Sequence, residues 1–354
     1  MTATENNDVM MCKRKDTMKI DELLSCLEAN NFSGEVLSSA LTLEGDEQQA
    51  LFALARARRH EHFPDDQAQV RSVIEVSNVC RQKCLYCAIG RTTQERNYTL
   101  DAKTMAMLIN YLYDKGRRTV LLQSGENLDE RFVTDVVTAV SEVKKLHADL
   151  RLILCMGDLS ETDYKRLYDA GATDYILKFE ASREELFSAC KPRDSLPNRL
   201  SCIRTLHKIG YRVGSGNIVG LPGQTMDDLV ADLKLAHDLP LAMNSTTIFV
   251  PAENTEYANE PAGNPVLTLN MMALLRIMNP HRLMPTTSSL EKMMHDGQYL
   301  GLMAGANTVT IHDGTPEEFH KFFPIYSAKR VRPQIDHFRD IVNRAGMTAH
   351  FSVQ

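Results

Sequence analysis

The amino-acid sequence predicts an α/β protein built as a (β/α)8 TIM barrel. Eight short apolar runs alternate with amphipathic helical patterns along most of the 354 residues. A repeated order of strand and then helix favours a parallel sheet, and eight repeats in this length suit a closed barrel better than a doubly wound sheet. Glycines near the ends of predicted helices support the boundaries. They are Gly116, Gly171, Gly210 and Gly305.

The region before the barrel divides into two parts. Residues 1–19 are mostly polar and charged and predict a flexible tail. Residues 20–66 predict a helical N-terminal extension. Its helices are expected at Ile20–Ala29, Glu35–Leu41 and Asp46–Arg59. Residues 67–354 are then assigned to the barrel, which ends in a helix near Pro333–Ala345.

The barrel elements follow in a regular order. The predicted strands are short runs of apolar and β-branched residues: Ser72–Ser77, Thr119–Gln123, Arg151–Cys155, Asp174–Phe179, Arg212–Val219, Ser245–Val250, Leu283–Thr287 and Thr308–His312. The predicted helices lie between and after them: Ala102–Lys115, Glu130–Leu146, Ser160–Ala170, Ser182–Ala189, Leu196–Ile209, Met226–Asp238, Leu267–Met278, Leu290–Met303 and Glu317–Phe323. In such a barrel the chemistry is expected where the strands end and the following loops begin.

Composition and charge narrow the class of protein. Hydrophobic residues make up 43% of the chain, and 40 Lys and Arg face 46 Asp and Glu for a net charge of −6. This composition excludes disorder as the dominant state, and the lack of basic blocks argues against nucleic-acid binding. No apolar run reaches the roughly 18 residues of a membrane-spanning helix, and no signal-peptide pattern is found. We therefore expect a cytoplasmic protein that does not bind membranes.

The strongest local signal is a cysteine triplet. Cys80, Cys84 and Cys87 form a C-x3-C-x2-C arrangement directly after the first predicted strand. Three thiolates can hold three irons of a 4Fe-4S cluster and leave the fourth iron open to another ligand. The alternative is a structural zinc site completed by His60 or His62, although zinc ligands more often come as two pairs.

The triplet, with the aromatic Tyr86 before its last cysteine, resembles the radical S-adenosylmethionine (radical SAM) superfamily. The resemblance implies an enzyme with two cofactors, a 4Fe-4S cluster held by Cys80, Cys84 and Cys87, and S-adenosylmethionine (SAM) bound to the open iron. One electron from the cluster cleaves the sulfonium and yields a 5′-deoxyadenosyl radical. The implied partners are a small-molecule substrate enclosed in the barrel and an electron donor of the flavodoxin or ferredoxin type.

Further strand-end segments match the same superfamily. Leu122–Glu126 resembles the Gly-Gly-Glu segment that contacts the SAM amino group, and Glu180 and Arg199 resemble a ribose- or amino-binding carboxylate and an arginine that pairs with the methionine carboxylate. The strand beginning at Gly216 resembles one whose backbone meets the adenine. Without the resemblance, an ordinary turn or a surface salt bridge would explain these residues. The SAM-binding residues implied are Tyr86, Gln123, Ser124, Glu126, Glu180, Arg199, Gly216, Ile218 and Gly220.

Polar residues near other strand ends are the candidates for substrate contact. They are Lys178, Thr246, Thr287, Ser289 and His312. For His312 a hydrogen-bonded structural role is the alternative, and Lys178 could instead extend along the surface. Cys155 on the third strand is a further residue of interest, because alternate strand residues point into a barrel. The other cysteines outside the triplet lack ligand spacing and are expected to be buried or bystanders.

Within the superfamily, the helical extension and the segments Asn198–Leu200, Gly220–Thr225 and Gly305–Asn307 resemble the biotin-synthase-like group. The residues of the segments Leu122–Glu126 and Val219–Thr225 are most similar to those of the HydE-type maturases of iron-only hydrogenase. Residues 178–181 read Lys-Phe-Glu-Ala where that type has Arg-His before Glu-Thr, and no cysteine follows Cys202 for an accessory cluster. Another biotin-synthase-like enzyme, such as a methylornithine-synthase-like mutase, and a zinc-stabilised binding protein without turnover are the alternatives.

Overall fold

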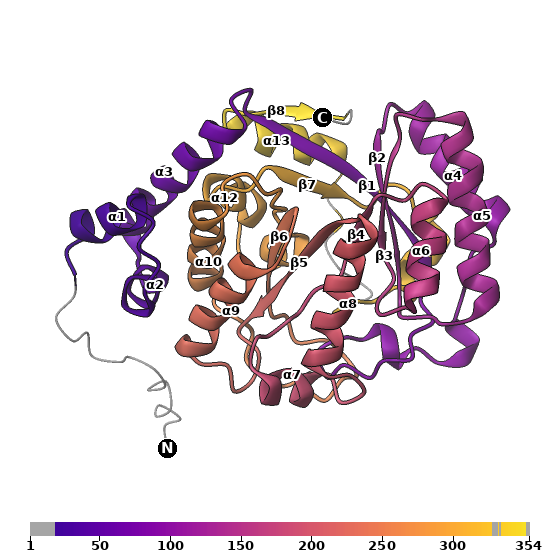
Figure 1. The fold of residues 1–354 in the computed structure, drawn as a ribbon, viewed down its shortest axis with the longest axis horizontal. Coiled ribbons are helices and arrows are strands. Elements are labelled where there is room, and N and C mark those ends of the chain that lie inside the picture. The colour runs from indigo at the N-terminus through magenta and orange to yellow at the C-terminus, as the bar shows by residue number, and fades with distance from the viewer. Residues whose placement is uncertain (1–17, 328–331, 333, 352–354) are drawn as a thin grey trace, which may run out of the picture.

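Seven parallel strands curl into a barrel-shaped sheet in the computed structural model, which describes residues 18–327, 332 and 334–351 (Figure 1). The strand order is β6-β5-β4-β3-β2-β1-β7, and every pairing between named strands in the described part is parallel. The strands are β1 (Gln67–Ser77), β2 (Thr119–Ser124), β3 (Arg151–Cys155), β4 (Asp174–Ile176), β5 (Arg212–Val219), β6 (Met243–Ile248) and β7 (Thr308–Ile311). The predicted α/β parallel barrel is confirmed.

The predicted strand Leu283–Thr287 is the exception. It forms only two isolated parallel bridges, Leu283 to Met243 on β6 and Pro285 to Thr308 on β7. Proline has no backbone N–H to donate, so a continuous ladder cannot pass through Pro285. The eighth place in the barrel is therefore taken by an extended segment with irregular pairing.

A strand that the sequence did not predict completes the sheet. β8 (Thr348–His350) pairs in parallel with the first residues of β1, Gln67–Gln69. Three residues carry too little pattern to be recognised, and the pairing joins segments 281 positions apart along the chain, as the register Gln67 to Thr348 shows. Figure 1 shows β8 and the preceding helix α13 (Ile335–Arg344) lying along β1.

Helices surround the sheet on its outer face. They are α4 (Ala102–Asp114), α5 (Glu130–Leu146), α6 (Glu161–Asp169), α7 (Glu184–Cys190), α8 (Leu196–Ile209), α9 (Met226–Asp238), α10 (Pro265–Met278), α11 (Ser288–Met293) and α12 (Gly297–Met303). The predicted helix Leu290–Met303 is divided into α11 and α12, because Asp296 takes a left-handed conformation with φ 57°. The predicted helix Glu317–Phe323 is a 3-10 helix over Glu317–Phe322. No helix of the described ranges is long and apolar enough to cross a membrane.

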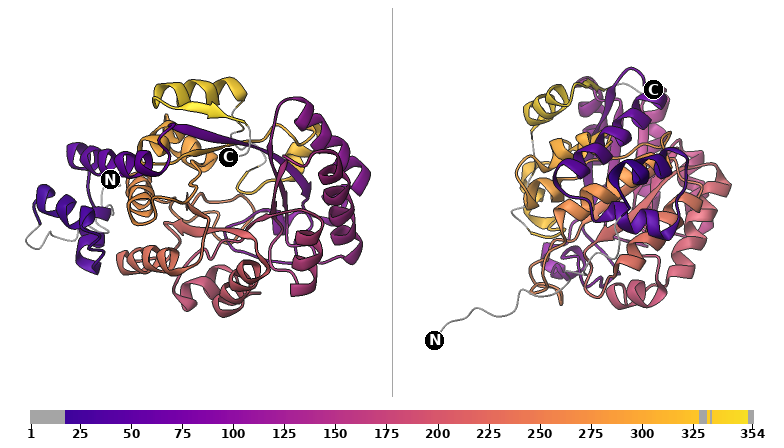
Figure 2. Two further views of the ribbon diagram at one scale, coloured as in Figure 1. Left: turned by 45° about the horizontal axis from the view of Figure 1, so that its top comes forward. Right: turned by 90° about the vertical axis from the view of Figure 1, so that its left-hand side faces the viewer.

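The N-terminal extension consists of α1 (Ile20–Glu28), α2 (Gly34–Leu41) and α3 (Gly45–His62), which pack beside α9 and α10 (Figure 2). Buried polar contacts attach it: the Asn270 amide donates to the carbonyls of Leu41 at 2.9 Å and Leu43 at 2.8 Å. Satisfied buried hydrogen bonds of this kind define one docking geometry. Nearly all of the predicted tail, residues 1–17, lies outside the described residues.

Gly216 is required by the spacing of two strands. It stands opposite Ser245 in the β5–β6 register, and a Cβ atom at this position would overlap the Ser245 carbonyl oxygen. We expect Gly216→Ala to lower the free energy of unfolding by about 3 kcal/mol, the upper part of the range for overpacked sites. Urea unfolding followed by circular dichroism measures this.

The matched control for that substitution is Gly34→Ala, because Gly34 lies at the start of α2 with no atom within 4 Å of its added Cβ. The control should be neutral or slightly stabilising. Equal loss of stability in both variants would contradict the packing explanation.

Candidate active site

A cavity of about 400 Å³ opens inside the barrel at the carboxyl ends of the strands. Most of the predicted site residues line it: Cys80, Cys84, Tyr86, Cys87, Gln123, Ser124, Glu126, Lys178, Glu180, Arg199, Ile218, Thr287, Ser289 and His312. Segments from β1 to β7 thus bring the predicted cysteine, SAM and substrate residues around one space. Their individual roles are not tested by this placement.

Three predicted residues do not line the cavity. Thr246 is fully buried on the other face of β6, while its neighbours Ser245 and Thr247 line the cavity. Adjacent strand residues point to opposite faces, and the pair Thr246-Thr247 offered no polarity difference from which to choose. The prediction for Thr246 is therefore wrong by one residue.

Gly216 on β5 and Gly220, which follows the end of β5, also lie outside the lining, whereas Ile218 between them contacts the cavity. Gly220 has φ 93°, a conformation that favours glycine, and an added Cβ would overlap Gly263. The Gln224 side chain accepts from the Gly220 N–H at 2.7 Å and donates to the Ile218 carbonyl at 2.9 Å. Both glycines are thus explained by backbone packing, and Gln224 serves the turn.

The cysteine loop follows β1 and forms one wall of the cavity. Cys80, Cys84 and Cys87 are all free thiols. Burial raises the pKa of Cys84 and raises that of Cys87 to about 12, and in both the Lys191 ammonium acts in the opposite direction. Burial dominates, so these thiols are protonated in the metal-free protein and would lose their protons on binding iron, a step that the Lys191 cation favours. The donor set and its surroundings therefore fit an iron–sulfur cluster.

The zinc alternative does not fit the geometry. His60 and His62 lie at the end of α3, before β1, whereas the cysteine loop follows the other end of this 11-residue strand. No group of three His, Cys, Asp or Glu side chains in the described ranges is placed to hold a single metal ion. A closed four-ligand site that includes either histidine is thereby contradicted.

Glu180 sits at a strained turn four residues after the end of β4. Its φ of 63° is left-handed, and it is fixed because its N–H donates to the Gly216 carbonyl and its carbonyl accepts from the Ile218 N–H, both at 2.9 Å. Its carboxylate lies 3.1 Å from the Lys178 ammonium and accepts from the Tyr86 hydroxyl at 3.2 Å. Burial opposes its charge, but Lys178 and Lys191 hold its pKa below the ordinary value. Backbone strain of this kind is concentrated at functional sites.

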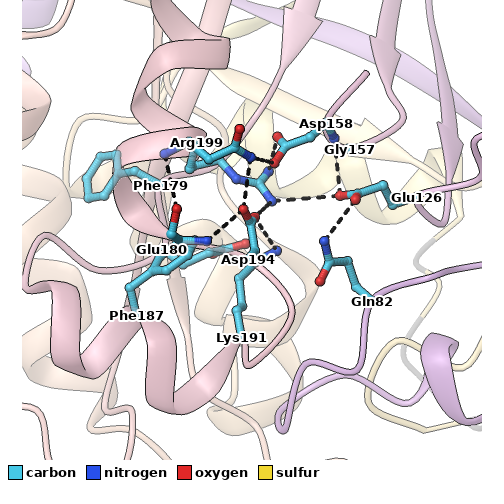
Figure 3. Close-up of polar contacts among 12 residues, drawn as sticks. Gln82, Glu126, Gly157, Asp158, Phe179, Glu180, Phe187, Lys191, Asp194 and Arg199 are labelled. Atoms are coloured by element: carbon cyan, nitrogen blue, oxygen red, sulfur yellow. Dashed lines mark hydrogen bonds and ion pairs between the residues drawn. The ribbon is translucent and has the colours of Figure 1, made fainter. Parts of the chain in front are cut away.

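Arg199 lies within a cage of three carboxylates (Figure 3). Its guanidinium is 2.7 Å from Asp194, 3.3 Å from Asp158 and 3.8 Å from Glu126, and the residue is only 4% exposed. Despite burial, Asp158 and Asp194 raise the pKa of Arg199. The arginine was expected to receive the methionine carboxylate of SAM, yet here the protein's own acids already neutralise it. Sequence reasoning missed Asp158 and Asp194, because neither belongs to a recognisable motif.

The cage predicts a pH dependence of stability. Burial raises the pKa of Asp158 from 3.8 to about 6, whereas Arg199 lowers that of Asp194 to about 2 against the effect of burial. A raised carboxyl pKa means that the folded state holds the proton more tightly. The stabilising contribution of Asp158 is therefore complete below pH 3.8 and is lost as the pH rises through 6, while Asp194 titrates below this window.

We expect the Asp158→Asn variant to show a flatter dependence of unfolding free energy on pH between 4 and 6.5 than the parent protein. Urea titrations at four pH values measure the slope. The exposed Asp169→Asn variant is the control and should keep the parent slope. Parallel curves for the parent protein and Asp158→Asn would contradict the assignment.

The floor of the cavity carries an unusual charge. Arg71 on β1 is 2% exposed, and within the described ranges its guanidinium donates a hydrogen bond to the Met243 sulfur at 3.1 Å. Burial and the nearby Arg151 lower its pKa to about 9, which leaves it a cation at neutral pH. The Asp174 carboxylate acts on this pKa in the opposite direction, but no carboxylate in the described ranges forms an ion pair with Arg71, so the guanidinium can receive an anion. Nothing in the sequence pattern distinguished Arg71 from a structural residue.

Hydroxyl groups and a neutral histidine complete the walls. The serines and threonines of the lining are Ser124, Ser245, Thr247, Thr286, Thr287, Ser288, Ser289 and Thr310. The Lys178 ammonium donates to the Thr247 hydroxyl at 3.2 Å. His312 has Nδ1 3.3 Å from the Glu75 carboxylate, and burial lowers the pKa of His312 to about 4, so the imidazole is neutral at pH 7. Cys155 also lines the cavity, as its position on the third strand suggested.

Comparisons with known proteins agree with this geometry. The family model "Radical SAM superfamily" matches residues 74–236. The chain is 35% identical over 311 residues to the [FeFe] hydrogenase maturase subunit HydE of Thermotoga maritima, covering 87% of this chain and 88% of that protein. It is 24% identical to a biotin synthase of Chlorobium phaeobacteroides, covering 75% of this chain and 80% of the relative.

Solved structures show the same fold. Methylornithine synthase superposes with a TM-score of 0.80 at 23% identity, covering 94% of this chain and 97% of that one. The hydrogenase maturase HydG superposes with a TM-score of 0.78 at 16% identity, covering 95% and 77%. With its cysteine loop at the mouth of a parallel barrel and a HydE relative along most of its length, the chain belongs to the radical SAM superfamily, whose enzymes use a 4Fe-4S cluster and SAM.

Proposed function

We propose that the protein is a HydE-like radical SAM enzyme that acts on a small anionic substrate in the barrel and contributes to the maturation of an iron-only hydrogenase. Cys80, Cys84 and Cys87 would hold the cluster. Bound there, the cluster and SAM supply one electron and a 5′-deoxyadenosyl radical that abstracts hydrogen or attacks the substrate. The similarity to HydE over 87% of the chain supports the reaction class.

The observation that carries the substrate class is the charge inside the cavity. In the described ranges no carboxylate forms an ion pair with Arg71 at the floor, and Lys178, which pairs with Glu180, lines the same cavity. Buried guanidinium groups bind carboxylates and other anions through charge-assisted hydrogen bonds. The hydroxyl wall would orient the rest of a polar molecule.

The residues have separable tasks in this proposal. Tyr86, Ile218 and the Glu180 carboxylate would hold the nucleoside part of SAM, since they lie together on one side of the cavity. The enclosing barrel walls would exclude water, which quenches reactive intermediates. His312 is neutral at pH 7 and would offer a hydrogen bond rather than a charge. A flavodoxin- or ferredoxin-type electron donor and a cytoplasmic location stay predictions.

Anaerobic reconstitution tests the reaction class. The purified chain should bind about four irons, and reduction by dithionite with SAM should release 5′-deoxyadenosine. Absence of the nucleoside from protein that contains iron would refute the radical SAM assignment. One bound zinc and no nucleoside would instead support a binding protein.

Complementation tests the biological role. Expression in a host that lacks HydE should restore hydrogenase activity, and Arg71→Met should reduce this restoration at least about tenfold, as expected for loss of a charge-assisted contact. Arg71→Lys, which keeps the charge, should retain part of it. Nucleoside production without complementation would show a radical SAM enzyme with another substrate.

A further inference from the structure

Glu126, at the turn after β2, is held by the chain on all sides. One carboxylate oxygen accepts from the Gln82 amide at 2.8 Å and lies 2.6 Å from the Arg81 guanidinium. The other accepts from the Asp158 N–H at 3.1 Å and lies 3.8 Å from Arg199. The carboxylate thus accepts two hydrogen bonds and lies within ion-pair distance of two guanidinium groups, and its side chain is only 4% exposed.

Two of those donors belong to the cysteine loop. Arg81 and Gln82 are the two residues that follow Cys80. The backbone of Glu126 holds the same segment, because its carbonyl accepts from the Arg81 N–H at 2.9 Å and its own N–H points to the Cys80 sulfur at 3.4 Å. The side chain and the backbone of Glu126 therefore contact three consecutive residues of the cysteine loop, 80–82.

Two glycines allow the close packing around Glu126. A Cβ atom on Gly125 would overlap the Val79 carbonyl oxygen and lie 2.7 Å from Cys80 Cβ. A Cβ atom on Gly157, which has φ +80°, would lie 2.5 Å from Glu126 Cγ. The turn and the loop are thus in direct contact, with glycines where the two segments approach most closely.

We propose that Glu126 is a positioning residue, which fixes residues 80–82 of the cysteine loop through its contacts with Cys80, Arg81 and Gln82. The inference rests on the proposed cluster site but concerns the order of the loop itself. Figure 3 shows the same carboxylate joined to Gln82 on one side and to the Arg199 cage on the other. Through it the loop is connected to the buried ion pairs of α8.

Thiol reactivity in the metal-free protein tests the proposal without any need for turnover. The rates at which iodoacetamide alkylates Cys80 and the remote Cys26 are measured by peptide mass spectrometry, and their ratio reports loop order at constant global stability. Glu126→Gln removes the charge-assisted contacts and should raise this ratio about tenfold or more. Glu95→Gln, an exposed change in the same loop region, is the matched control and should leave the ratio unchanged.

An exchange of the two partners separates positioning from a general loss of structure. Gln82→Glu sets two carboxylates against each other and should raise the ratio by a similar factor. The double variant Gln82→Glu with Glu126→Gln restores an amide–carboxylate hydrogen bond with the partners reversed, so it should return the ratio most of the way to the parent value. The double variant reconstituted with iron should also keep the midpoint potential of its cluster closer to the parent than either single variant.

The opposite results overturn the proposal. If both single variants keep the parent alkylation ratio while Glu126→Gln weakens SAM binding tenfold in the iron-loaded protein, Glu126 is a SAM ligand. If the double variant behaves no better than the single variants, the Gln82–Glu126 contact does not order the loop. Failure to form 5′-deoxyadenosine would refute the proposed function and leave these alkylation results interpretable.

Discussion

Cys84→Ser should reduce 5′-deoxyadenosine formation to background and lower the iron bound after reconstitution. Cys84 is buried in the wall of the barrel cavity between the other two cysteines of the loop. A serine hydroxyl stays protonated at neutral pH and does not replace the thiolate as an iron ligand, so the cluster would keep only two protein ligands. Iron analysis and chromatography of the nucleoside measure both effects.

Cys26→Ser provides the control for this prediction. Cys26 lies on α1 in the N-terminal extension, remote from the cavity, and the same change of sulfur to oxygen there should leave iron content and nucleoside yield unchanged. A Cys84→Ser protein with full iron and parent nucleoside yield would show that the ligand assignment is incorrect. Equal losses in both variants would indicate a general effect of thiol removal on folding.

Arg199→Ala should destabilise the protein by about 3–5 kcal/mol, because removal of one partner from a buried ion pair leaves uncompensated charge. Three carboxylates, those of Glu126, Asp158 and Asp194, would then face one another in a space with little water. Affinity for SAM should also fall by about tenfold or more, whether the guanidinium contacts SAM or only supports the cavity wall. Urea unfolding and equilibrium dialysis measure the two effects.

A second substitution tests the electrostatic cause of that loss. Adding Asp194→Asn to Arg199→Ala removes one of the stranded charges and should recover part of the lost stability, although Asp194→Asn alone should destabilise the parent protein. The loss caused by Arg199→Ala should also shrink below pH 6, where Asp158 takes up a proton. A loss that is independent of pH and purely additive with Asp194→Asn would point to lost packing instead.

Much of the fold follows from local patterns in the sequence. The bounds of α5, α8 and α9 agree with those predicted, since apolar periodicity and residues such as Ser195 and Thr225, whose side chains accept the first helical N–H groups, mark where helices begin. The closing segment at Pro285 and the short β8 were not predicted correctly. Their pairing depends on strands distant in the sequence and on too few residues to form a pattern.

The candidate site also has features that the sequence predicts and features that it does not. The three cysteines lie within eight consecutive residues, 80–87, so their spacing alone places three thiols in one loop, and the resemblance to a superfamily supplies the cofactors. Lys178, Ser289 and His312 were found because strand ends in a parallel barrel meet at one face. Thr246 was misassigned because alternation gives two faces but does not say which one is inside.

The sequence by itself determined the order of the elements, the cysteine loop and the membership of the superfamily, because each depends on residues that are neighbours along the chain. Only the tertiary structure decided that Arg199 is enclosed by Glu126, Asp158 and Asp194. It also decided that Arg71 forms the cavity floor and that Glu126 contacts the cysteine loop. Ion pairing and burial are set by distances between groups far apart in sequence, and these distances exist only once the barrel has folded.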